Sequence, residues 1–179
     1  RSIFNSFQDM PENTMVLVVF SMSKSYTMCG MRCGALACLG ATKESAQIFK
    51  DAMSYSSRSV WSNVIRVAQK VLVDINTNPQ LKTQTDNERA AFRELITHRG
   101  QAFYGQAKHI GLRCCPYKHG YFISIPCRNP GKAAEYLAGE HVYVVPQPQG
   151  LRFSPCAVTM EKCLKAPEMI KRAIERAAQ

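Results

Sequence analysis

The sequence SMSKSYTMCGMRCG spans residues 21–34 and lies between two apolar segments. These are residues 15–20, MVLVVF, and residues 33–40, CGALACLG. Continuous apolar runs of this length are typical of strands that are buried on both faces in α/β proteins. Two such strands do not make a covered sheet. We therefore expect partner strands elsewhere, or a chain that begins part-way through a larger domain.

The polar segment between the two predicted strands contains a lysine in an unusual place. Lys24 follows a buried strand and has serines on both sides. Burying an ammonium group is costly and lowers its pKa, and an easily neutralised lysine is a nucleophile suited to an aldehyde. Arg32, Ser21 and Ser23 offer donors for a phosphate near that amine. From the residues alone, a solvated loop for Lys24 and a surface ion pair for Arg32 remain the alternative.

Composition excludes several classes of protein. The chain has 179 residues, of which 46% are hydrophobic and 20% charged, so we expect a packed globular protein. No apolar stretch approaches the ~20 residues of a spanning helix, and no signal segment opens the chain. We therefore expect a soluble, cytoplasmic protein with no membrane partner. The formal charge of +10 is spread along the chain without a basic run or recognition motif, so we expect no nucleic-acid partner.

The spacing of the eight cysteines indicates whether they bind a metal or form disulfides. None of them forms a C-x-x-C pair, and the four histidines make no close ligand pair with them. We therefore expect no metal site. Several cysteines lie inside apolar runs, which favours buried free thiols in a reducing cytosol over a disulfide scaffold.

Helical spacing follows the second apolar run. Thr42 is the expected N-cap of the first helix, and Gly111 is the expected C′ residue of the last and longest one. The predicted helices are residues 43–54, 60–75 and 86–110, separated by a polar stretch at 55–59 and a loop at 76–79.

The second half of the chain alternates short strands and helices and predicts an α+β unit. Pro167 is expected in the first turn of the closing helix. The predicted elements are strands at 120–125, 141–145 and 151–154, a turn at 146–150, and helices at 133–138 and 168–178.

Several of these segments together resemble one known family. Ser-x-Ser-Lys at 21–24, followed by Gly-x-Arg-x-Gly at 30–34, resembles the lysine signature of the class I/II aminotransferases. These are pyridoxal-phosphate (PLP) enzymes of fold type I. Residues 55–63 lie where the family has a polar loop that reaches the neighbouring subunit. Residues 120–122 are similar to its small-domain strand, and residues 149–153 resemble the strand with the carboxylate-binding arginine.

The resemblance implies roles for individual residues. It implies that Lys24 forms a Schiff base with PLP and later moves a proton, while Arg152 binds the substrate α-carboxylate. Core packing remains an alternative for Tyr121 and Phe122. The implied cofactor-binding residues are Ser21, Ser23, Lys24 and Arg32; the implied substrate-binding residues are Arg152, Phe122 and Tyr121; the implied partner-subunit loop residues are Tyr55, Ser57 and Arg58.

The resemblance also implies the fold class and its incompleteness. We expect an α/β chain with the C-terminal portion of a PLP-binding large domain at 1–85 and a small α+β domain at 86–179. The family residues that contact the cofactor ring lie farther upstream of the lysine than this chain extends. The chain is therefore expected to be a C-terminal part with little activity alone.

The implied function is transfer of an amino group between an amino acid and a 2-oxo acid, in a homodimer. Two alternatives stay open. One is a PLP-dependent carbon–sulfur lyase or decarboxylase on the same fold. The other is a non-catalytic aminotransferase-like module that senses a ligand or mediates dimerisation.

Overall fold

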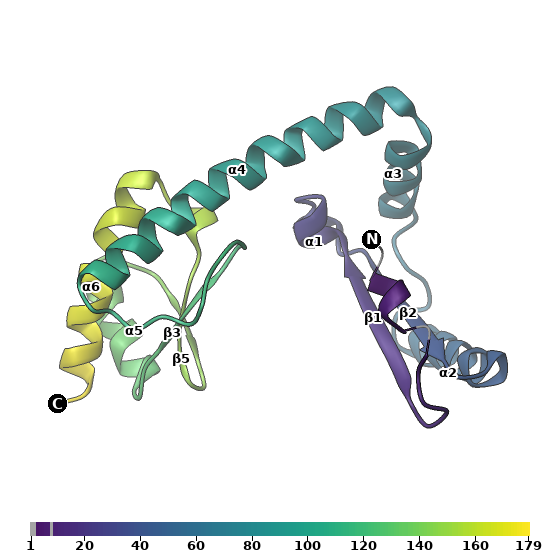
Figure 1. Ribbon diagram of the computed structural model, residues 1–179, viewed down its shortest axis with the longest axis horizontal. Coiled ribbons are helices and arrows are strands. Elements are labelled where there is room, and N and C mark those ends of the chain that lie inside the picture. Colours follow the sequence, from purple (N-terminus) through teal and green to yellow (C-terminus); the bar gives the residue numbers. More distant parts are fainter. Residues whose placement is uncertain (1–2, 8) are drawn as a thin grey trace. The chain divides into compact units, whose positions relative to one another are not determined.

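The computed structural model describes residues 3–7 and 9–179, which form two compact units (Figure 1). Unit 1 is Arg1–Thr85 and unit 2 is Asp86–Gln179. The long helix α4, Pro79–His109, begins in unit 1 and continues through the start of unit 2. Each unit is described by itself below.

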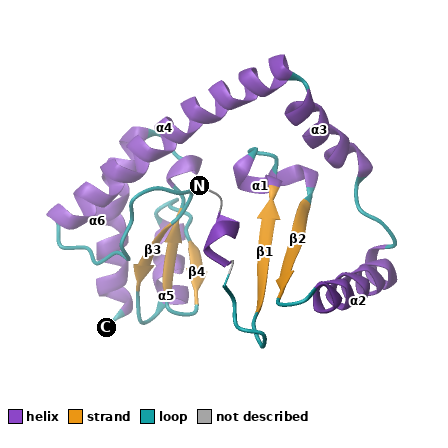
Figure 2. Cartoon of the chain, turned by 45° about the vertical axis from the view of Figure 1, so that its right-hand side comes forward, coloured by secondary structure: helices purple, strands orange, loops and turns teal. Residues whose placement is uncertain are grey.

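Unit 1 contains a two-stranded antiparallel sheet of β1, Met15–Ser21, and β2, Gly34–Gly40 (Figure 2). Both strands were predicted, and both are confirmed. Their expected burial on both faces is wrong for this chain, because apolar side chains such as Val19 remain 77% exposed. Among the described elements, α2 makes the main helix contact with the sheet, along β2. The remaining short elements of this region are η1, Ile3–Phe7; α1, Met22–Ser25; and η2, Cys29–Met31.

Helix α2, Lys43–Trp61, is longer than its sequence pattern indicates. Thr42 is its N-cap as predicted, with a capping box in which Thr42 and Ser45 bond each other's backbone N–H. The expected interruption at 55–59 is wrong. Two serine hydroxyls there donate to carbonyls one turn back, Ser57 Oγ to Ser54 O at 3.3 Å and Ser59 Oγ to Ser56 O at 2.8 Å, so they are satisfied within the helix.

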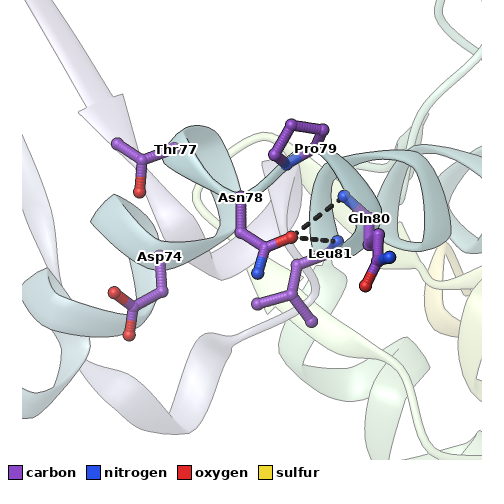
Figure 3. Close-up of a pocket in the computed structure, with 6 residues that line it drawn as sticks. All are labelled: Asp74, Thr77, Asn78, Pro79, Gln80 and Leu81. Carbon is purple, nitrogen blue, oxygen red and sulfur yellow. Dashed lines mark hydrogen bonds between the residues drawn. The ribbon is translucent and has the colours of Figure 1, made fainter.

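The loop predicted at 76–79 is reduced to one residue between α3, Arg66–Thr77, and α4. Asn78 Oδ1 accepts hydrogen bonds from Gln80 N at 2.9 Å and Leu81 N at 3.2 Å, so Asn78 caps α4 (Figure 3). These residues and the end of α3 line an open hollow of about 810 Å³.

Unit 2 contains an antiparallel sheet in the order β3-β5-β4, with helices packed on one of its faces. Its buried core joins the sheet to the helices through large side chains such as Phe103, Leu137 and Ile170. The elements are β3, Ile123–Pro126; α5, Pro130–Gly139; β4, Val145–Gln147; β5, Gly150–Phe153; η3, Pro155–Ala157; and α6, Met160–Ala177.

The predicted starts of β4 and of the closing helix are wrong. The strand expected at 141–145 begins only at Val145, because His141 turns the chain after α5 with a φ of 59°. The closing helix begins at Met160, with Thr159 as its N-cap, so Pro167 lies inside it and not in its first turn. Pro167 is fully buried in the core, and its packing accompanies the loss of one helical hydrogen bond.

Within the described part of the chain, no helix combines the length and the apolar character that a bilayer crossing requires.

Candidate functional site

The segment between β1 and β2 forms a closed connection, residues 22–33. Ser21 and Gly34 face each other at the ends of the strands, and Met22 N then donates to Cys33 O at 3.1 Å. Met22 is fully buried beneath the connection, and its carbonyl accepts from Met28 N at 3.2 Å. Everything between Met22 and Cys33 is therefore held over the end of the sheet.

Lys24 lies in α1, a single helical turn at the start of this connection. Ser21 caps the turn, because its Oγ accepts from Ser23 N at 3.2 Å, and Ser25 Oγ donates to Ser21 O at 2.6 Å. The Lys24 side chain is exposed, as in the solvated alternative, but it lies on a helical turn and not in a loop. The serines around Lys24 therefore shape the turn that presents it.

Arg32 lies at the far end of the same connection, with an exposed side chain. Its Nη1 donates to Cys29 O at 2.9 Å and lies 3.8 Å from Cys29 Sγ. The alternative of a surface ion pair is not found, because Arg32 has no carboxylate partner among the described residues. Most of the guanidinium donors therefore remain available to an anion.

The backbone of the connection is strained. Thr27, with a φ of 55°, and Arg32, with a φ of 49°, are two of the four non-glycine residues with positive φ in the described chain. Such conformations cost about 1 kcal/mol or more each and occur preferentially at functional sites. The strain at Arg32 turns the chain back into β2.

Gly34 and Tyr26 explain how the connection is held in place. A Cβ on Gly34 would lie 2.5 Å from Phe20 O, so only glycine allows the two strands to meet here. Tyr26 packs edge-on against Phe20, with ring centroids 6.3 Å apart, and its hydroxyl lies 3.4 Å from Asn76 Nδ2 of α3. The contact between Tyr26 and Asn76 was not predicted, because fifty residues separate them and no motif joins them.

The predicted partner-subunit residues Tyr55, Ser57 and Arg58 lie on α2 and not in a loop. Tyr55 is 81% exposed. Arg58 Nη1 donates to Ser62 O at 3.3 Å, which places its charge at the C-terminal end of α2.

In unit 2, Arg152 lies on the central strand β5. Its neighbours Leu151 and Phe153 are buried in the core, so Arg152 projects from the opposite face of the sheet. Its guanidinium lies over the Phe122 ring, 4.4 Å from the centroid, and its Nε is buried without a hydrogen-bond partner in the described structure. A buried donor without a partner costs about 1–3 kcal/mol, so this arginine suits a ligand that supplies an acceptor.

Tyr121 and Phe122 directly precede β3, so the strand predicted from residue 120 begins later. Tyr121 is half-buried, and its carbonyl accepts a hydrogen bond from Ser154 Oγ at 3.2 Å. Neither side chain belongs to the buried core, so the alternative of core packing is wrong for both.

Residues 4–170 match the family described as aminotransferase class I and II. The chain belongs to this family. The elements from β1 to η3, which carry both groups of site residues, lie entirely inside the matched range. The family is named for amino-group transfer, so this match does not favour the lyase and decarboxylase alternatives.

Solved aminotransferases share the fold. The aminotransferase from Anaerococcus prevotii is 30% identical with a TM-score of 0.86, over 94% of this chain and 41% of its own. Cytoplasmic aspartate aminotransferase from Giardia lamblia is 18% identical with a TM-score of 0.70, over 90% of this chain and 41% of its own.

A third similar structure is a mutant aspartate aminotransferase from Thermus thermophilus complexed with tryptophan. It is 23% identical, with a TM-score of 0.64, over 91% of this chain and 42% of its own. The chain thus spans about two fifths of the length of these aminotransferases. No curated protein sequence matches it.

The residues of this aminotransferase chain fit a phosphorylated aldehyde. The connection 22–33 carries one primary amine at Lys24 and one largely unpaired guanidinium at Arg32, with serine hydroxyls at its start. An amine suits the aldehyde of PLP, and a guanidinium suits its phosphate. Arg152, with its unpartnered Nε, suits a carboxylate.

Proposed function

We propose that this chain provides the lysine, the phosphate-binding arginine and the carboxylate-binding arginine of a PLP-dependent aminotransferase. The enzyme moves an amino group between an amino acid and a 2-oxo acid. The observation that carries the proposal is the closed connection 22–33, which has Lys24 at one end and a strained, largely unpaired Arg32 at the other.

Lys24 acts through its Nζ. The exposed side chain projects from a capped helical turn, which fixes the backbone that presents the amine to a bound aldehyde. When bound, PLP supplies an electron sink that stabilises negative charge at the substrate Cα. The Lys24 amine then carries the proton to and from that carbon.

Arg32 and Arg152 bind and orient the cofactor and the substrate, respectively. Arg32, with Ser21 and Ser23, binds the phosphate, and its fixed backbone limits the entropy lost on binding. Arg152 binds the α-carboxylate through two parallel charge-assisted hydrogen bonds. Tyr121 and Phe122 line the place of the substrate side chain.

The wider organisation follows from the same proposal. Residues 1–85 belong to the PLP-binding domain, and residues 86–179 form the small domain. The enzyme works in the cytoplasm as a homodimer, and Tyr55, Ser57 and Arg58 of one subunit approach the site of the other. The exposed position of Tyr55 supports this role.

Equilibrium dialysis against PLP tests the proposal with two matched pairs of variants. Lys24→Ala is compared with Lys50→Ala, an exposed lysine of α2, and Arg32→Gln with Arg66→Gln on α3. We expect retention of PLP to fall only in Lys24→Ala and Arg32→Gln. Equal retention by both members of each pair would contradict the proposed site.

A further inference from the structure

The neighbours of Arg152 on its face of the unit 2 sheet restrict the conformations of its side chain. Arg152 lies on the central strand, directly opposite Ser124 of β3 on one side and Val145 of β4 on the other. Phe122 lies two residues before Ser124 and therefore projects from the same face, diagonal to Arg152. This register places the Phe122 ring against the guanidinium.

The Phe122 ring covers one face of the guanidinium and occupies none of its in-plane donors. With Cζ 4.4 Å from the ring centroid, Arg152 is within the ~6 Å of a cation–π contact. The N–H donors lie in the guanidinium plane, so a ring on its face fixes the direction in which they point without competing for them. Arginine otherwise loses much rotamer freedom on binding. Phe122 itself is held by β3 and keeps 39% of its surface exposed.

We propose that Phe122 is a positioning residue that holds the Arg152 fork ready for the substrate carboxylate. The inference rests on the proposed function of Arg152. A positioning role differs from contact with the substrate side chain. The stack orients Arg152 for every carboxylate ligand, including one that carries no side chain.

Two carboxylate probes separate these tasks in NMR titrations of the chain. Acetate has no side chain, whereas 3-phenylpropanoate carries an aromatic one. Binding is followed at the Arg152 Nε–Hε resonance, which the Phe122 ring current shifts. The variants are Phe122→Leu, which removes the ring, and Phe122→Tyr, which keeps it. Phe92→Leu, on an exposed residue of α4, is the matched control.

Positioning predicts that Phe122→Leu moves the Nε–Hε resonance and weakens both probes equally, by about fivefold to tenfold. Phe122→Tyr and Phe92→Leu keep wild-type affinity. If Phe122→Leu weakens only 3-phenylpropanoate, the positioning role is overturned and the proposed function stands. If neither probe moves the Arg152 resonance in the wild type, the positioning role and the proposed function of Arg152 are both overturned.

Unchanged amide shifts of β3 and β5 in Phe122→Leu establish that its sheet is intact. Where those shifts change, Phe122→Met replaces it as the ring-free variant and is judged by the same two outcomes.

Discussion

Gly150 provides a sharp test of how the Arg152 strand is built. A Cβ placed there would lie 2.2 Å from Ile125 O, 3.0 Å from Ile125 C and 3.1 Å from Pro126 Cα. All three atoms belong to the backbone of β3, which has no flexible end to move aside. Gly150→Ala therefore requires β3 and β5 to separate at this end of the sheet.

The magnitude follows from the required separation. Ordinary contact with a Cβ begins at 3.4 Å, so the strands must separate by about 1 Å, which breaks hydrogen bonds of ordinary length. The pairs Pro126↔Gly150 and Ile125↔Leu151 are affected first. Two backbone hydrogen bonds contribute about 1 kcal/mol each, and the buried side chains of Ile125 and Leu151 must also repack. Together these effects lower the free energy of unfolding of unit 2 by about 3–4 kcal/mol.

Hydrogen exchange and urea unfolding measure this loss. Amide exchange in β3 and β5 reports unit 2, while fluorescence of Trp61, the single tryptophan, reports α2 in unit 1. We expect faster exchange in Gly150→Ala with an unchanged Trp61 transition. The control is Gly105→Ala in α4, where nothing lies within 4 Å and alanine stabilises the helix by about 1 kcal/mol. Wild-type exchange in Gly150→Ala would refute the reasoning.

Three further predictions concern the cap, the core and a thiol. Thr42→Ala removes the α2 capping box and should lower the stability of unit 1 by about 1 kcal/mol in the Trp61 transition, while Thr42→Ser keeps it. Leu137→Ala, in the fully buried core, should cost about 2–5 kcal/mol by calorimetry, and the same change at exposed Leu164 should cost far less. Burial, with a smaller contribution from Cys115, raises the pKa of Cys114 to about 11. Because the thiolate is the reactive form, alkylation of Cys114 should quicken about tenfold per pH unit from pH 8 to 10, and a plateau near pH 8 by peptide mass spectrometry would contradict this.

Apolar runs and caps were sufficient to predict β1, β2 and the start of α2, because strand propensity and helix capping depend on local sequence. The polar stretch at 55–59 misled the prediction, since serine and tyrosine only mildly disfavour a helix, arginine favours one, and no residue there breaks one. Pro167 also misled the prediction. It lies inside α6 because its burial in the core of unit 2 outweighs the lost hydrogen bond.

The candidate site was likewise predictable only where it depends on local sequence. Lys24 and Arg32 are close in sequence, so a motif places them in one connection. The stack of Arg152 on Phe122 depends on the register between β3 and β5, which the intervening residues 127–149 leave unspecified. The exposure of Lys24 likewise depends on which elements cover the sheet, and no local pattern contains that information.

The most direct test of the account is to reduce the complex with PLP by borohydride and map the modified lysine by peptide mass spectrometry. We expect one dominant label on Lys24 and its suppression by excess inorganic phosphate, which competes for Arg32. A label distributed evenly over the exposed lysines, or unaffected by phosphate, would contradict the claim that the connection 22–33 is a cofactor site.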